Sequence, residues 1–142
     1  MHKMKPYTHQ VQYYETDMMG ITHHANYIRW MEEARIDLMD QLGFPYQKME
    51  AEGVLSPVRS VSCTYLKPST FGDSIRISVS LTSFNGVVLT IRYTMTNQRD
   101  ETVCEARSEH VFVSRDGRIV RMKKEQPAFC GAVFKNLEPP QE

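Results

Sequence analysis

The spacing of apolar residues divides the chain into one long amphipathic helix and several strands. Between His24 and Leu42, apolar side chains recur at steps of three and four, at Tyr27, Met31, Ala34, Leu38 and Leu42. This is the period of one helix face, and the charged residues of the segment fall largely on the other side. Gly43 ends the pattern, and Pro45 cannot continue a helix. The sequence therefore predicts one strong helix over residues 24–42, about 28 Å long at 1.5 Å per residue.

The other segments carry the alternating pattern of strands. Apolar and polar side chains alternate over residues 75–81, as in a half-buried strand. Asn85-Gly86, a strong hairpin signal, connects this segment to a predicted strand over 87–96. Further strands are predicted over 7–15, 54–67 and 103–114, with turns at 17–22, 72–73 and 116–117. Residues 126–137 fit either a short helix or an irregular lid.

This order of elements predicts an α+β fold in a single domain over residues 1–142. The economical packing wraps a curved antiparallel sheet of five to six strands around the long central helix. One helix of five turns cannot cover both faces of such a sheet. One face therefore remains partly bare, and dimerisation is the usual way to cover it.

Composition removes several classes of partner. The 17 Lys and Arg residues balance the 17 Asp and Glu residues, so the chain lacks the positive surplus typical of nucleic-acid binding. No apolar run approaches the roughly 20 residues that cross a bilayer, and the N-terminal residues lack the apolar stretch of a secretory signal. Three widely spaced cysteines without a C-x-x-C pair fit a reducing compartment. We expect a cytoplasmic protein without nucleic-acid partners or membrane insertion.

The segment from Tyr13 to Arg35 carries the candidate chemistry. Asp17 lies on a loop before the helix, and Gly20 allows that loop to turn tightly. The first turn of a helix offers unpaired N–H groups that can hold an oxyanion, while a nearby carboxylate holds or activates a water. In the alternative interpretation, Asp17 is an ordinary helix cap, the commonest role of Asp at such a position. Thr22, closer to the helical pattern, is the better placed cap.

Other side chains of the segment have both structural and functional interpretations. His23 and His24 lack the i, i+4 spacing of metal ligands on a helix, so we expect neither a metal nor another cofactor. A histidine that positions substrate or backbone is more plausible, and His24 is predicted to belong to the catalytic site with Asp17. The thioethers of Met18 and Met31 can adapt to acyl chains, although core packing is the commoner role of methionine. Neither a P-loop nor a G-x-S-x-G elbow occurs in the sequence.

Taken together, these residues resemble the signature of hot-dog-fold acyl-CoA thioesterases of the 4-hydroxybenzoyl-CoA thioesterase type. The matching positions are Tyr13, Thr16, Asp17, Gly20, His24, Asn26, Tyr27, Trp30, Glu33, Ala34 and Arg35. Residues 62–73, SCTYLKPSTFGD, resemble the strand-to-turn segment of the same family. With the order of strands, the resemblance extends over nearly the whole chain.

The resemblance implies hydrolysis of an acyl-CoA, or related acyl thioester, to a free acid and a thiol. Asp17 matches the catalytic carboxylate, acting as the nucleophile or as the base that deprotonates a water. Amides near His24 and Ala25 would polarise the carbonyl. The resemblance further implies a homodimer or homotetramer, with the active site between two subunits. Candidate substrate-binding residues are Gly20, Tyr27, Met18, Met31 and Arg59. For the coenzyme A phosphates, charge alone offers Arg59, Lys67, Arg115 or Arg121.

Three residues depart from the family pattern. Glu15 stands where the family usually has Asp and is given a supporting role, and Thr22-His23 replaces an apolar and an aromatic residue. The change at Thr22-His23 keeps open an alternative function, a non-catalytic module that binds or senses acyl thioesters on the same fold. The catalytic His and Glu of hot-dog dehydratases are not found in their expected context.

Overall fold

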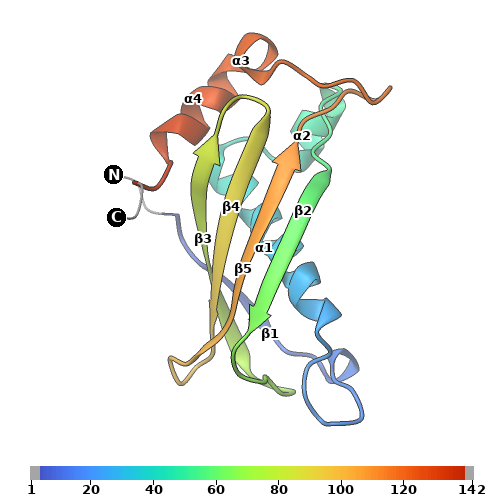
Figure 1. The fold of residues 1–142 in the computed structure, drawn as a ribbon, viewed down its shortest axis with the longest axis vertical. Helices are drawn as coiled ribbons and strands as arrows, with labels where there is room; N and C mark the ends of the chain where they lie inside the picture. Colours follow the sequence, from blue (N-terminus) through green and yellow to red (C-terminus); the bar gives the residue numbers. More distant parts are fainter. Residues whose placement is uncertain (1–3, 140–142) are drawn as a thin grey trace.

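The computed structural model describes residues 4–139 as one five-stranded antiparallel sheet wrapped around one long helix (Figure 1). The sheet has the order β1-β3-β4-β5-β2. Its strands are β1 (Tyr7–Gln10), β2 (Val58–Tyr65), β3 (Ser74–Phe84), β4 (Val88–Thr96) and β5 (Thr102–Val111). The helices are η1 (Tyr13–Glu15), α1 (Ala25–Leu42), α2 (Tyr46–Ala51), α3 (Met122–Glu125) and α4 (Pro127–Lys135). The prediction of an α+β fold with five to six strands around a long helix is therefore confirmed.

The long helix ends where its sequence requires. Gly43 adopts a left-handed φ of 87°, and its N–H donates to the carbonyl oxygens of Met39 and Asp40. A left-handed residue at this position is the usual way to end a helix, and glycine has no Cβ to oppose it. At the other end, α1 begins at Ala25, one residue after the predicted start, with His24 at the capping position. The expectation that Thr22 caps the helix is wrong, because its hydroxyl bonds to Ser69 instead.

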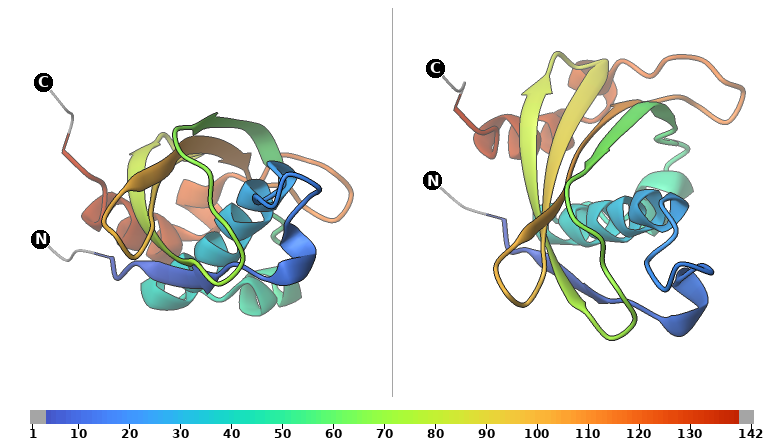
Figure 2. Two further views of the ribbon diagram at one scale, coloured as in Figure 1. Left: turned by 90° about the horizontal axis from the view of Figure 1, so that it is seen from below. Right: turned by 60° about the horizontal axis from the view of Figure 1, so that its bottom comes forward.

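Strands β3, β4 and β5 form the centre of the sheet. Buried and exposed residues alternate along β3, and the predicted hairpin joins it to β4. Asn85 stabilises this hairpin by accepting hydrogen bonds from the N–H groups of Val87 and Val88, both at 2.8 Å. Seen from below, the sheet curls over α1, so that its concave face contacts the helix (Figure 2). The predicted turn at Asp116-Gly117 is also present, with Gly117 at a φ of 85°.

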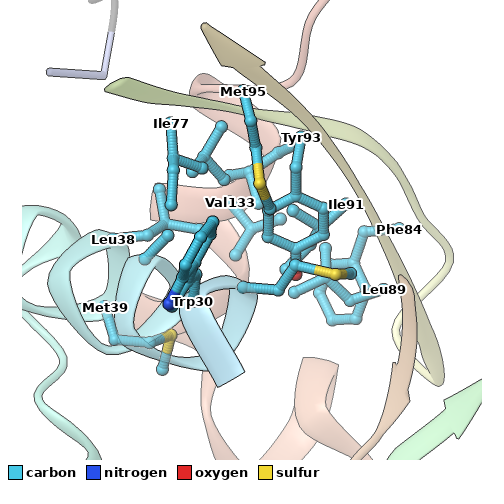
Figure 3. Close-up of a cluster of buried hydrophobic side chains, with 14 of the residues drawn as sticks. Trp30, Leu38, Met39, Ile77, Phe84, Leu89, Ile91, Tyr93, Met95 and Val133 are labelled. Atoms are coloured by element: carbon cyan, nitrogen blue, oxygen red, sulfur yellow. The ribbon is translucent and has the colours of Figure 1, made fainter. Parts of the chain in front are cut away.

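The core lies between α1 and the concave face of the sheet. Trp30 and Leu38 of α1 meet Ile77, Tyr93 and Met95 of the sheet (Figure 3). At the end of the molecule near the β3–β4 hairpin, α4 closes the core with Phe129 and Val133, both fully buried. The sequence allowed either a short helix or an irregular lid over residues 126–137. The structure forms mainly a helix there, and its buried face completes the core.

Two other expectations about secondary structure are corrected. The predicted strand 7–15 ends at Gln10, because the chain turns into η1 and the side chain of Glu15 accepts the N–H of Gln12 at 2.8 Å. The predicted strand 54–67 is confined to Val58–Tyr65, immediately after Pro57, which has no N–H to donate. Helix α2 was not predicted, because six residues are too few to show a helical period.

The convex face of the sheet is bare, as expected, but it is polar. Outward positions are occupied by serine, threonine, arginine and glutamate, for example Ser78, Arg92 and Glu105. Exposed apolar side chains lie instead along the end strand β2, where Val58, Val61 and Tyr65 are 48%, 40% and 44% exposed. The most exposed ones lie on η1 and in the loop before α1; they are Tyr13, Tyr14, Met18 and Met19. The exposed apolar surface is therefore at this edge and this loop and not on the convex face.

Candidate active site

A tight loop before α1 carries the candidate catalytic carboxylate. Thr16 and Thr22 form an isolated antiparallel bridge, and the Asp17 N–H donates to the Ile21 carbonyl at 2.9 Å. Gly20 has a φ of 77°, which a residue with a Cβ rarely adopts, so the expected role of glycine in this turn is present. One carboxylate oxygen of Asp17 accepts the Met19 N–H at 2.9 Å. The side chain is exposed, which leaves its second oxygen available to a substrate or a water.

A cavity of about 350 Å³ opens beside the N-terminus of α1. Its wall is mainly apolar and is formed by the loop before the helix, the first turn of the helix and the segment that follows β2. The lining residues are Ile21, Thr22, His24, Tyr27, Tyr65, Leu66, Lys67 and Pro68. The Tyr65 ring contacts the Tyr27 ring edge-on at 5.1 Å, and its hydroxyl donates to the His24 carbonyl at 3.2 Å. These contacts fix the cavity wall against the helix start.

A buried trio of hydroxyl groups ties the far wall of this cavity to the helix. Ser69 Oγ lies 2.7 Å from Thr22 Oγ1 and 2.8 Å from the Tyr27 hydroxyl. The Thr22 N–H also donates to the Ser69 carbonyl at 2.8 Å. Burial raises the pKa of the Tyr27 phenol, so this group is a neutral hydrogen-bonding partner near pH 7. The trio therefore holds the loop after β2, the loop before α1 and the helix itself in one arrangement.

The start of α1 offers one unused amide. The Ala25 N–H donates to His23 Nδ1 at 3.3 Å, so this amide, expected to polarise a carbonyl, already has an acceptor. The Asn26 and Tyr27 amides donate to the carbonyl oxygens of His23 and His24. Within residues 4–139, no acceptor is found for the His24 N–H. This amide lies at the positive end of an 18-residue helix, where developing negative charge is stabilised.

Glu15 has a structural role. Its side chain is buried, and it accepts hydrogen bonds from the Trp30 indole at 2.7 Å and from the Gln12 N–H at 2.8 Å. His9 Nε2 lies 2.8 Å from the same carboxylate. Although burial opposes ionisation, these hydrogen bonds hold the pKa of Glu15 below its usual value. Glu15 therefore anchors the start of the loop to the helix, and Asp17 is the carboxylate left free for chemistry.

The predicted site residues other than Arg59 lie in three different surroundings. His24 and Tyr27 line the cavity. Asp17, Met18 and Gly20 lie together on the exposed loop, outside the residues that line the cavity of the single chain. Met31 has no exposed surface and packs in the core, 3.7 Å from the Cys63 sulfur, so it offers nothing to a ligand in this chain.

Arg59 lies apart from the other predicted site residues. It stands where the register of β2 shifts, beside a separate groove next to the β3–β4 hairpin. Lys67, one of the sequence candidates for the coenzyme A phosphates, lines the cavity, whereas the role of Tyr65 in the cavity wall was missed. Their segment carries part of the family resemblance, which could have indicated a role beyond that of a strand and turn.

No group of three or more His, Cys, Asp or Glu side chains in the described range is arranged to hold a metal ion. None of the helices formed by residues 4–139 combines the length and apolar character that a bilayer crossing needs.

Comparison with known proteins places this geometry in a family. A model of the thioesterase-like superfamily matches residues 11–137. YneP of Bacillus subtilis (strain 168) is 39% identical over 107 residues, which are 75% of this chain and 78% of YneP. The acyl-CoA thioester hydrolase YbgC of Escherichia coli O157:H7 is 30% identical over 97 residues, 68% of this chain and 72% of YbgC.

Solved structures confirm the fold. DHNA-CoA thioesterase from Staphylococcus aureus superposes with a TM-score of 0.89 at 26% identity, over 92% of this chain and 89% of that protein. The hot-dog fold inferred from the sequence is thereby confirmed, while the narrower 4-hydroxybenzoyl-CoA type stays a prediction. With a family match that spans the sheet, the long helix and the candidate site, this chain belongs to the thioesterase-like superfamily.

Proposed function

We propose that this protein hydrolyses acyl-CoA thioesters at the start of α1. The observation that carries the proposal is the pairing of a free carboxylate, Asp17, with an apolar cavity and an unused amide at a helix N-terminus. The family and the thioester hydrolase activity of YbgC support the same reaction. The acyl group occupies the cavity, and the thioester oxygen faces the His24 N–H.

The proposed hydrolysis depends on stabilising the negative charge that develops on the thioester oxygen. As the carbonyl carbon is attacked, its oxygen becomes negative, and one well-placed amide donor typically stabilises that charge by about 2.7–4 kcal/mol. The attacking group is either an Asp17 oxygen, which forms a mixed anhydride that water then cleaves, or a water that Asp17 deprotonates. The thiolate of coenzyme A leaves in both routes. Thiolate is a good leaving group, so the site can work without a strong general acid.

The site is proposed to be completed by a second copy of the chain. Asp17 projects from an exposed loop and does not line the cavity of its own chain, and β2 presents an unpaired, partly apolar edge. A homodimer, or a tetramer built from dimers, covers this edge and gives the loop a wall to face. Lys67 lines the cavity and is the described cation best placed to meet a coenzyme A phosphate. Its Nζ forms an ion pair with Glu101 Oε2 at 2.7 Å.

The acyl preference is proposed to be aromatic. Three of the residues lining the cavity, His24, Tyr27 and Tyr65, present aromatic rings that contact one another. Rings of this kind pack edge-on or offset against a further ring. This supports the 4-hydroxybenzoyl-CoA type over enzymes that prefer long aliphatic chains.

Replacement of Asp17 tests the proposal. We expect Asp17→Asn to lower kcat for thiol release about 10²–10⁴-fold, because the amide is neither a nucleophile nor a base. The measurement uses benzoyl-, butyryl- and palmitoyl-CoA with a thiol reagent. The matched control is Asp40→Asn, an exposed acid on α1, which should keep the wild-type rate. Equal rates for wild type and Asp17→Asn would remove Asp17 from the mechanism.

The exclusion of Asp17 from the cavity wall of the single chain favours one second candidate, an acyl-thioester binding module without turnover. The same assay separates the two functions. A binding module retains benzoyl-CoA at one equivalent per site and releases no thiol above the rate without protein.

A further inference from the structure

A second cavity lies further along α1, on the side of α2. Its volume is about 290 Å³, and none of its lining residues belongs to the cavity at the helix start. Arg35, in its wall, is ten residues beyond Ala25 and hence about 15 Å along the helix axis. Apolar side chains form most of the remaining wall; they are Met39, Met49, Val54, Pro57, Val58 and Phe112.

Arg35 is a buried cation without a carboxylate partner. Arg35 is only 8% exposed. No acid among residues 4–139 forms an ion pair with its guanidinium. One guanidinium nitrogen, Nη1, donates to the Tyr93 hydroxyl at 3.3 Å, while Nε has no hydrogen-bond partner. Buried charges in proteins are normally paired, because an unpaired one loses its hydration without compensation.

His110 supplies a second buried nitrogen without a partner. The Tyr93 hydroxyl accepts from Arg35 and lies 2.6 Å from Ser108 Oγ, which in turn lies 2.7 Å from His110 Nε2. In the tautomer in which Ser108 donates to Nε2, the proton of the neutral imidazole is on Nδ1. This Nδ1 is buried and has no partner.

Arg35 and His110 line the same small void. Its volume is about 10 Å³, enough for one oxygen atom. Arg35, Tyr46 and Ser56 line both this void and the larger cavity. The charged Arg35 side chain, whose Nε–H has no acceptor, therefore lies at the inner end of a mainly apolar cavity.

We propose that this cavity binds a monocarboxylate with a small apolar body, its carboxylate on Arg35 and its apolar part against the methionines and Phe112. Glu32 and Glu50 also line the cavity and would repel a second negative charge, which is why a single carboxylate is favoured. The volume suits a body the size of a benzene ring or a short chain. The carboxylate belongs to a free acid, because this cavity shares no lining residue with the one at the start of α1.

Titration calorimetry with sodium benzoate at constant ionic strength tests the site directly. We expect saturable binding of benzoate and none of benzamide, which has the same shape without the charge. Arg35→Met should weaken benzoate binding about 10- to 100-fold, since a charge-assisted hydrogen bond is lost. Arg76→Met, at an exposed arginine of β3, is the matched control and should leave the affinity within about twofold of wild type, as expected for a surface substitution.

Two further variants keep the test independent of how well Arg35→Met folds. Ser56→Leu narrows the cavity while Arg35 is retained, and it should also weaken benzoate binding. Glu32→Gln removes a competing negative charge and should strengthen it. Absence of benzoate binding to the wild type, or equal binding by Arg35→Met, would overturn the proposal and leave the void to a water molecule.

Turnover tests whether this cavity is separate from the hydrolytic site. Arg35→Met should lose benzoate binding and hydrolyse benzoyl-CoA and butyryl-CoA at the wild-type rates. Loss of both benzoate binding and hydrolysis would overturn the separation of the two cavities. The calorimetry needs no turnover, so failure of the proposed hydrolysis would not be mistaken for failure of this site.

Discussion

His110 is a buried histidine whose environment makes protonation costly. It is 1% exposed, and burial, together with the nearby positive charge of Arg35, lowers its pKa from 6.5 to about 3. Between pH 6.5 and about pH 3, His110 is protonated in the unfolded chain and neutral in the folded chain. The free energy of unfolding therefore falls as the pH drops below about 6.5, by at most about 1.4 kcal/mol per pH unit from this group.

Replacement of His110 should remove that part of the pH dependence. We expect His110→Gln to show a smaller loss of unfolding free energy between pH 7 and pH 5 than the wild type, measured by urea denaturation. Glutamine cannot titrate and still offers an oxygen to Ser108. His23→Gln, at an exposed ring, serves as the control and should keep the wild-type slope. Identical slopes for His110→Gln and wild type would assign the acid sensitivity to other groups.

At the scale of single elements, the loop between η1 and α1 depends on the buried hydroxyl trio. Thr22→Val keeps the shape of the side chain and removes its bonds to Ser69 Oγ and the Ser69 carbonyl. We expect a loss of about 1–3 kcal/mol in unfolding free energy, because two buried hydrogen bonds worth about 0.5–1.5 kcal/mol each are lost. Chemical denaturation measures it, with the exposed Thr8→Val of β1 as a control within about 0.5 kcal/mol of wild type. A Thr22→Val protein as stable as the control would show that the trio contributes little.

The elements that were predictable from sequence are those whose pattern is long and local. The period of Tyr27, Met31 and Leu38 predicted α1, and the alternation from Ile75 to Leu81 predicted β3. Elements decided by contacts between distant segments were not predictable. Glu15 shortens the first strand because it reaches the indole of Trp30, a contact that no local pattern reveals.

The candidate site was predictable only in part, for the same reason. Asp17, Gly20 and His24 are consecutive parts of one segment, and the structure keeps them close to the helix start. Arg35 was overlooked as a potential binding residue, because an arginine beside the apolar stripe of a helix is ordinarily solvated. Its burial results from Tyr93 on β4, which is 58 residues away in the sequence.

At the scale of the whole molecule, the distribution of exposed apolar surface indicates how two chains meet. The convex face of the sheet is polar, whereas β2 ends the sheet with partly exposed apolar side chains and backbone groups that no described strand pairs. Ile28 of α1, 41% exposed, adds to the apolar surface. We predict a dimer joined along β2, which covers this surface and places the exposed Asp17 loop of each chain against its neighbour.

A charge placed on β2 should therefore separate the chains and stop turnover together. Val61 is 40% exposed and faces the helix side of β2, so Val61→Glu buries a carboxylate in the seam while costing the isolated chain little. We expect sedimentation velocity to show a dimer for the wild type and a monomer for Val61→Glu, with benzoyl-CoA hydrolysis lost in proportion to the dimer. Ser78→Glu, on the polar convex face, should leave assembly and rate unchanged. A Val61→Glu protein that stays dimeric would move the seam elsewhere, and an active monomer would show that one chain alone completes the site around Asp17.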